Sequence, residues 1–163
     1  MTEKTSVLFV CLGNIVRSPL AENLFRQRVE QAGLADQFTV YSAGTSGYHV
    51  GESPDSRMRQ VAAQRGLTYS GRSRQFWSGD FEAFDWIIAM DDSNRTDILR
   101  QARSDSDRAK VRLMREFDPQ ADGDMVVPDP YYGGIDGFHN VYDIVERATG
   151  ELFDHIQSET DAA

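Results

Sequence analysis

Four short runs of apolar, β-branched and aromatic residues alternate along this chain with longer stretches that have a helical period. The runs cover residues 7–10, 38–42, 86–90 and 111–114, and runs of this kind predict buried β-strands. Strands that alternate with helices form a parallel sheet that has helices on both faces. The sequence therefore predicts an α/β fold with a four-stranded parallel sheet, whose ligand site lies at the carboxyl ends of the strands.

The helical stretches that separate these strands cover residues 20–33, 53–66, 91–102 and about 140–157. Gly33 and Gly66 end the first two, as glycine commonly does after the last turn of a helix. With 163 residues, 40% of them hydrophobic, the chain can bury one sizeable core but not two. We expect a single domain over residues 1–163, with a core from about residue 6 to about residue 158 and short flexible termini.

The charge balance argues against two classes of partner. A formal net charge of −9 lacks the basic footprint that nucleic acids or an anionic membrane surface require. No apolar run approaches the roughly 20 residues of a membrane span, and the first residues do not resemble a secretory signal. We expect a cytoplasmic protein that binds neither nucleic acid nor membrane.

The segment FVCLGNIVRSPLAE connects the first predicted strand to the first predicted helix and contains Cys11, the only cysteine. A strand followed by a tight loop and a helix N-terminus leaves backbone N–H groups free to bind an anion. Gly13 permits close approach of the backbone to a ligand, and Asn14 tolerates a positive φ. Arg17 can hold two phosphate oxygens, and Pro19 suits the first helical turn. These features predict a phosphate-binding loop.

Cys11 itself has two interpretations. A lone cysteine after an apolar run is commonly an inert core residue. A helix N-terminus and a nearby arginine, however, favour the thiolate, which is the nucleophilic form. Ser18 could cap the helix or donate to that thiolate. Because a core cysteine would explain none of the loop residues, we favour a nucleophile that attacks phosphorus.

The same residues resemble the low-molecular-weight protein tyrosine phosphatases, whose loop reads V-C-x-G-N-x-C-R-S-P. The matching residues are Val10, Cys11, Leu12, Gly13, Asn14, Ile15, Val16, Arg17, Ser18 and Pro19. The resemblance continues through YSAGTSGYHVGESPD, SRQF, DWIIAMDDSN and VPDPYYGG to the last helix. It implies hydrolysis of phosphotyrosine in proteins through a phosphocysteine intermediate, with no metal or cofactor, by a monomer or a weakly self-associating chain.

The segment VPDPYYGG supplies a candidate second catalytic residue. Local sequence allows Asp129 to be either a turn cap or a catalytic acid. The resemblance implies that Asp129 is the general acid and base. Tyr131 and Tyr132 beside it, with Tyr48 from the SGYHVG segment, could form walls against the phosphotyrosine ring.

The chain departs from the family pattern at two places. Val16 stands where many members have a second cysteine, so Cys11 has no partner with which to form a protective disulfide. The segment SGRSRQF also lacks the histidine that supports the loop in many members. We expect Ser42 and neighbouring backbone to provide that support. The three histidines, including His49, have no metal spacing and are expected to be surface or satisfied side chains.

Three other functions share parts of this pattern. Arsenate reductases of this fold need further cysteines, which this chain does not have. Arginine phosphatases of this type tend to have threonine where this chain has Ile15, and an apolar side chain suits an aromatic substrate better. A noncatalytic phosphate-binding module would need Arg17 but neither Cys11 nor Asp129. The joint presence of these residues favours the tyrosine phosphatase.

Overall fold

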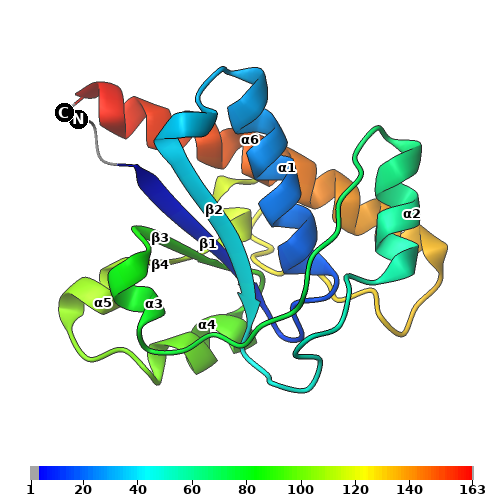
Figure 1. Ribbon diagram of the computed structural model, residues 1–163, viewed down its shortest axis with the longest axis horizontal. Coiled ribbons are helices and arrows are strands. Elements are labelled where there is room, and N and C mark those ends of the chain that lie inside the picture. Colours follow the sequence, from blue (N-terminus) through cyan, green and yellow to red (C-terminus); the bar gives the residue numbers. More distant parts are fainter. Residues whose placement is uncertain (1–3, 163) are drawn as a thin grey trace.

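The computed structural model describes residues 4–162 as one α/β domain (Figure 1). In chain order its elements are β1 (Thr5–Cys11), α1 (Arg17–Gln31), η1 (Ala35–Gln37), β2 (Phe38–Gly44), α2 (Ser56–Gln64), α3 (Asp80–Ala83), β3 (Trp86–Ala89), α4 (Asp92–Leu99), α5 (Asp105–Ala109), β4 (Val111–Leu113), η2 (Met114–Phe117) and α6 (Ile135–Ala162), where η denotes a 3₁₀ turn. Within the described range, no helix combines the length and apolarity that crossing a membrane requires.

The four strands form one sheet in the order β2-β1-β3-β4, and every neighbouring pair is parallel. Val7 in the central strand β1 pairs with Val40 of β2 and with Trp86 of β3. Cys11, the last residue of β1, pairs with Gly44, the last residue of β2. The predicted α/β class, parallel sheet and position of the loop at the end of the first strand are therefore confirmed.

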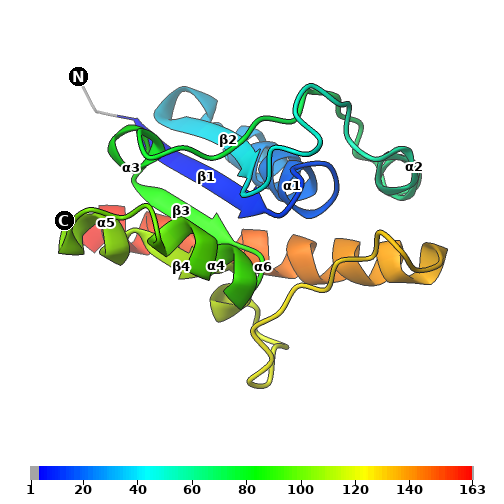
Figure 2. The same ribbon diagram turned by 90° about the horizontal axis from the view of Figure 1, so that it is seen from below.

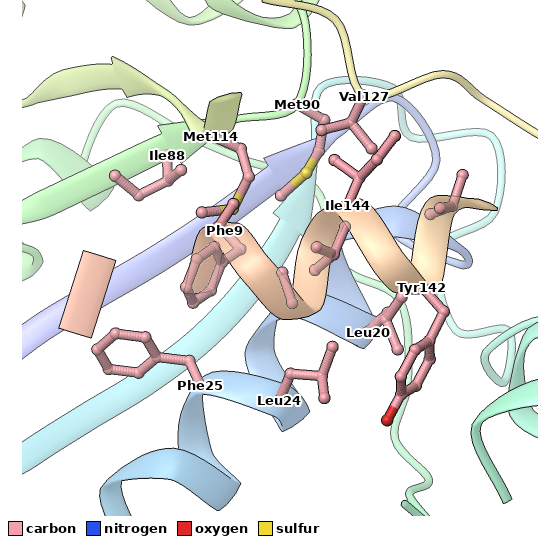
Figure 3. Packing of buried hydrophobic residues seen from close by; sticks show 14 of the residues in the cluster. Phe9, Leu20, Leu24, Phe25, Ile88, Met90, Met114, Val127, Tyr142 and Ile144 are labelled. Atoms are coloured by element: carbon pink, nitrogen blue, oxygen red, sulfur yellow. The ribbon is translucent and has the colours of Figure 1, made fainter. Parts of the chain in front are cut away.

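Both faces of the sheet are covered, which explains why β1 is apolar at successive positions. Val7 and Phe9 point into a core that includes buried residues of α1, α2 and α6. Figure 3 shows Phe9 packed near Phe25 of α1, with the two ring centroids 5.7 Å apart. Leu8 and Val10 point to the opposite face, where a second core includes residues of α3 and α4.

The long helix α6 differs most from its predicted bounds, because it begins at Ile135 rather than near residue 140. Gly137 weakens the helical signal there, whereas Phe138 is fully buried and anchors the first turns to the core. At the other end, α6 continues to Ala162, beyond the predicted end near residue 157. There, Thr160 Oγ1 donates to the carbonyl of Ile156 at 3.1 Å. Figure 2 shows α6 running along the length of the sheet.

Other departures concern short elements and caps. Helix α2 begins at Ser56, because the preceding Asp55 accepts hydrogen bonds from the backbone N–H groups of Arg57 and Met58. The expected start at Ser53 was therefore wrong. Helices α3 and α5 were not predicted, since four and five residues are too few to show a helical period. For residues 1–3 and 163, the expected flexible termini lie outside the described residues.

Candidate active site

The loop between β1 and α1 curls around the sulfur of Cys11. The backbone N–H of Asn14 lies 3.3 Å from Cys11 Sγ and points to it, and Ser18 Oγ lies 3.0 Å from the same atom. Asn14 has a φ of +55°, the left-handed conformation that turns the chain back on itself. Arg17 is the first helical residue, and Val16 at the N-cap position offers no polar side chain. The first N–H groups of α1 thus remain directed at the loop.

Side chains behind the loop support it. Asn14 Nδ2 donates to Ser18 Oγ at 2.8 Å and to Ser42 Oγ at 2.9 Å. Ser42 in turn donates to the carboxylate of Glu22. Ser73 Oγ donates to the carbonyl of Gly13 at 3.0 Å. Ser42 therefore contacts the loop as expected, and Glu22 and Ser73 are further residues that support the loop.

The end of β2 approaches the loop so closely that only glycine fits there. A Cβ atom on Gly44 would lie 2.7 Å from the carbonyl oxygen of Leu12. The next two residues, Thr45 and Ser46, donate backbone hydrogen bonds to the carbonyls of Cys11 and Leu12, each at 2.9 Å. Carboxyl ends of two neighbouring strands therefore hold the first half of the loop.

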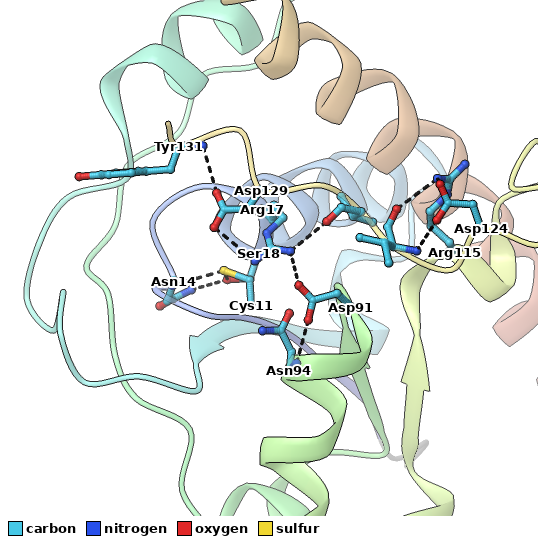
Figure 4. Close-up of polar contacts among 12 residues, drawn as sticks. Cys11, Asn14, Arg17, Ser18, Asp91, Asn94, Arg115, Asp124, Asp129 and Tyr131 are labelled. Carbon is cyan, nitrogen blue, oxygen red and sulfur yellow. Dashed lines mark hydrogen bonds and ion pairs between the residues drawn. The ribbon is translucent and has the colours of Figure 1, made fainter. Parts of the chain in front are cut away.

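Arg17 has a side chain that is only 3% exposed and is held in a defined orientation by its polar partners. Its Nη1 donates to Asp91 Oδ2 at 2.8 Å and to the carbonyl of Val127 at 2.9 Å. Asp91 also caps α4 by accepting from the backbone N–H of Asn94 at 2.8 Å (Figure 4). Because burial of an unpaired guanidinium is costly, these partners stabilise Arg17 at the floor of the site.

Asp129 lies across the site from the loop, in the segment between η2 and α6. Its Oδ2 is 3.6 Å from Arg17 Nη2, and its Oδ1 accepts from the backbone N–H of Tyr131 at 3.1 Å (Figure 4). The carboxylate side chain is 40% exposed, so water can reach it. The carboxylate is thus near the loop while the backbone of its own segment orients it.

The segment that carries Asp129 is anchored to β3 and to α6. The backbone N–H of Val127 donates to the carbonyl of Met90 at 2.9 Å. Further back, the fully buried carboxylate of Asp118 pairs with Arg115 and Arg147, each at 3.1 Å. Burial opposes ionisation of Asp118, but hydrogen bonds from Arg147 and the Gln120 N–H, with the charges of both arginines, outweigh it and lower its pKa.

A pocket of about 540 Å³ brings most of the predicted site residues together. Its lining comprises Cys11, Leu12, Gly13, Ile15, Val16, Arg17, Ser46, Tyr48, His49, Asp129, Tyr131 and Tyr132. Asn14 and Ser18, the other two predicted residues, lie behind the loop and support it. The side chains of Tyr48 and Tyr132 are largely exposed at the mouth of the pocket.

Sequence reasoning missed the part that Asp91 and His49 play in the site. Asp91 begins the third predicted helix, but it also lies just after β3, at the sheet edge where β1 ends at Cys11, and there it accepts a hydrogen bond from Arg17. His49 is a satisfied histidine, with Nδ1 2.7 Å from Glu52 Oε2, but it also lines the pocket. Its ring stands between the rings of Tyr48 and Tyr131, at 5.0 and 6.1 Å. No local pattern marks it.

The chemistry available to this pocket follows from its side chains. The thiol of Cys11, the guanidinium of Arg17 and the carboxylate of Asp129 line the same pocket together with apolar and aromatic side chains. Over residues 4–162, no three His, Cys, Asp or Glu side chains gather in the way that a metal site requires. A thiol beside anion-binding N–H groups, an arginine and a carboxylate has the groups that phosphoryl transfer can use.

Comparison with known proteins agrees with this geometry. A family model described as low molecular weight phosphotyrosine protein phosphatase matches residues 6–162. A low molecular weight protein-tyrosine-phosphatase of Streptomyces coelicolor is 44% identical over 156 residues, which cover 95% of each chain. A crystal structure of a protein tyrosine phosphatase from Entamoeba histolytica is 39% identical, with a TM-score of 0.91 over 96% of this chain and 99% of that chain.

A crystal structure of a Drosophila arginine phosphatase is also similar, at 33% identity and a TM-score of 0.85 over 92% of this chain and 96% of that chain. The fold is thus shared by proteins named for two different substrates, whereas the family match covers nearly all of this sequence. The chain belongs to the low molecular weight phosphotyrosine protein phosphatase family and is an enzyme of the protein tyrosine phosphatase class.

Proposed function

We propose that this protein hydrolyses phosphotyrosine in proteins through a phosphocysteine intermediate. Cys11 acts as the nucleophile, Arg17 binds the phosphoryl oxygens and Asp129 serves as general acid and then as general base. The observation that carries the proposal is the opposition of Cys11 and Asp129 across one pocket, with Arg17 in contact with the carboxylate. The reaction as proposed uses no metal and no cofactor.

In the first step, the Cys11 thiolate forms an S–P bond as the bond between phosphorus and the tyrosyl oxygen breaks. Asp129 gives its proton to that oxygen, so tyrosine leaves as a neutral phenol and Asp129 becomes a carboxylate. The loop N–H groups and Arg17 stabilise the charge on the equatorial oxygens. Ser18 Oγ, at 3.0 Å from the sulfur, can donate to the thiolate before attack and again when it leaves.

In the second step, the Asp129 carboxylate takes a proton from a water molecule that attacks phosphorus. The S–P bond breaks, inorganic phosphate forms and Cys11 returns as a thiolate. Asp129 is again protonated, so one water is consumed and the enzyme is restored. Asp129 Oδ2 lies 3.6 Å from Arg17 Nη2, the group proposed to bind the phosphoryl oxygens, and this position beside the phosphoryl group supports Asp129 as the carboxyl of both steps.

The aromatic lining supports phosphotyrosine as the substrate. A phosphotyrosine ring can lie between Tyr48 and the Tyr131 and Tyr132 pair while its phosphate reaches the loop. Ile15, which lines the pocket, adds an apolar contact near the ring. Phosphoarginine is the second candidate, since a named arginine phosphatase has the same fold. It is less well served, because a guanidinium leaving group would meet apolar walls.

The test compares hydrolysis of matched phosphotyrosine, phosphoserine and phosphoarginine peptides between mildly acidic and neutral pH. We expect turnover of phosphotyrosine alone, abolished in Cys11→Ser although that variant still binds the peptide. Asp129→Asn should lower kcat/KM for phosphotyrosine by about 10²-fold. Asp122→Asn removes a carboxylate from the same segment outside the pocket and is expected to stay within about twofold of wild type.

Other results would favour other functions. A preference for phosphoarginine would overturn the substrate proposal while keeping the phosphate chemistry. Equal turnover by Cys11→Ser would overturn the mechanism, and no turnover by any form would favour a noncatalytic phosphate-binding module.

We also propose a cytoplasmic enzyme that acts as a monomer or with weak self-association. We propose no nucleic-acid or membrane partner, in keeping with the net charge of −9.

A further inference from the structure

Arg57 lies at the start of α2 and is fixed there by the residue that caps the helix. Asp55 Oδ1 accepts from the backbone N–H of Arg57 at 2.8 Å. The guanidinium of Arg57 also pairs with Asp55, with Nη2 2.9 Å from Oδ2 and Nε 3.3 Å from Oδ1. The Asp55 side chain is 8% exposed, whereas that of Arg57 is 41% exposed. The carboxylate therefore determines which way the partly exposed guanidinium points.

The guanidinium lies over two aromatic rings that belong to different parts of the chain. Its carbon is 5.2 Å from the ring centroid of Tyr131 and 4.7 Å from that of Phe138. Both distances lie within the range of cation–π contacts. Phe138 is fully buried in α6, which packs against α2 (Figures 1 and 2). Tyr131 thus contacts an arginine that belongs to α2 and also packs on Phe138 of α6.

The same unit also touches the phosphate-binding loop. The backbone N–H of Asp55 donates to the carbonyl of Ile15 at 2.7 Å. Asp55 and Arg57 together therefore contact both walls of the pocket: the loop that carries Cys11 and the segment that carries Asp129. A shift of either residue would change the separation of these two walls.

The hydrogen bonds made by the backbone around Asp129 are short in range. Over residues 129–134 they join the Tyr131 N–H to the Asp129 carboxylate, the Gly133 N–H to the Pro130 carbonyl and the Gly137 N–H of α6 to the Gly134 carbonyl. The first two bonds lie within the segment, and the third joins only its end to the helix that follows. Outside its segment, Tyr131 packs against the main core, and its ring contacts Arg57 and, at 6.1 Å between ring centroids, His49.

We propose that Arg57 is a positioning residue for Asp129, and this inference rests on the acid role proposed above. By holding the Tyr131 ring, Arg57 fixes the backbone N–H that orients the Asp129 carboxyl. Losing this contact should weaken protonation of the leaving group while leaving attack by Cys11 intact. The defect should therefore grow as the leaving group becomes more basic.

The test measures kcat/KM for a series of aryl phosphates whose leaving phenols span a wide range of pKa, because kcat/KM includes transfer to Cys11. In Arg57→Met, which keeps an unbranched side chain without the cation, we expect about a tenfold loss for the most basic phenols. The loss should be less than about threefold for the most acidic phenols. Arg57→Lys, which keeps the charge without the planar group, should lie between Arg57→Met and wild type.

Arg65→Met is the matched control. Arg65 follows α2, lies 4.1 Å from the ring centroid of Tyr142 in α6 and pairs with Asp143, but it does not line the pocket. In Arg65→Met, kcat/KM should depend on the pKa of the leaving phenol as it does in the wild type, even if Arg65→Met and Arg57→Met lose similar stability. An equal change of slope in Arg65→Met and Arg57→Met would overturn the inference, as would an unchanged slope in Arg57→Met.

A double variant separates this inference from the proposed function. If Arg57 acts through Asp129, adding Arg57→Met to Asp129→Asn should lower kcat/KM for basic phenols by less than about twofold further. A further tenfold loss would show that Arg57 acts by another route and would overturn the inference. If Asp129→Asn itself had no effect, the proposed acid role would fail, and the inference would fail with it.

Discussion

At the scale of single residues, Asn14 combines an unusual backbone conformation with three side-chain hydrogen bonds. Its φ is +55°, and its amide bonds to Ser18, Ser42 and the backbone N–H of Arg74. We expect Asn14→Ala to be less stable than Asn14→Gly by about 1 kcal/mol, because glycine adopts positive φ without the Cβ clash. Urea denaturation measures the difference. Equal stability of the two variants would mean that backbone conformation contributes little here.

Val16, which stands where many family members have a second cysteine, should affect how the enzyme responds to oxidation. Cys11 is the only cysteine, so a sulfenic acid formed on it has no thiol in the chain with which to form a disulfide. We expect peroxide to inactivate the wild type with poor recovery on addition of thiol, and Val16→Cys to recover more fully. Activity after timed peroxide exposure and reduction tests this, with Val50→Cys, on an exposed residue outside the pocket lining, as the control. Full recovery of wild type after oxidation beyond the sulfenic stage would contradict the prediction.

At the scale of elements, the buried cluster of Arg115, Asp118 and Arg147 joins the segment after β4 to α6. Asp118→Asn would remove the buried charge that pairs with both arginines, and only Arg115 would keep another charged partner, the exposed Asp124, at 3.1 Å. We therefore expect a loss of about 2 kcal/mol in the free energy of unfolding at pH 7. Asp122→Asn, in the same segment but exposed, should change it by less than about 0.5 kcal/mol. Equal effects of the two substitutions would contradict the role of burial.

The pH dependence of the same variant has a definite sign. The folded-state pKa of Asp118 lies below its ordinary value of 3.8, so the carboxylate contributes stability above that pH and loses it as pH falls through the folded-state pKa. The stability gap between wild type and Asp118→Asn should therefore be widest near neutral pH and narrow below about pH 4. Urea denaturation between pH 7 and pH 3 measures this gap. A gap that stays constant over that range would contradict the assignment.

At the scale of the whole molecule, one sheet serves two cores. Val7 and Phe9 of β1 belong to the core with α1 and α6, while Leu8 and Val10 belong to the core with α3 and α4. Neither core can lose its packing without disturbing the strand that both share. We therefore propose that residues 6–158 form one cooperative folding unit.

The two tryptophans allow a direct test of this cooperativity. Trp77 lies in the segment before α3, and Trp86 begins β3. Single-tryptophan variants made by Trp86→Phe or Trp77→Phe should each show one urea transition by fluorescence. Within each variant, the midpoint of the fluorescence transition should match the midpoint of the transition measured by far-ultraviolet circular dichroism. Separate midpoints for the two probes in either variant would mean that the domain unfolds in parts.

Local sequence determined the fold class and the loop, because each depends on residues that are neighbours in the chain. Apolar runs predicted the strands, and the residues from Cys11 to Arg17 predicted a phosphate-binding loop between the first strand and the first helix. The structure has a loop at that place, and the N–H of its residue Asn14 points to Cys11 Sγ. The start of α6 could not be predicted in this way, since Gly137 hides the helical period and only the burial of Phe138 secures that turn.

Only the tertiary structure decided what surrounds the loop. Arg17 takes its partners Asp91 and Val127 from 74 and 110 positions further along the chain. His49 and Arg57 likewise reach Tyr131 through contacts that no sequence period encodes. Strand and helix patterns depend on backbone geometry that repeats over a few residues, whereas these contacts exist only after the parallel sheet has brought the ends of distant strands to one edge.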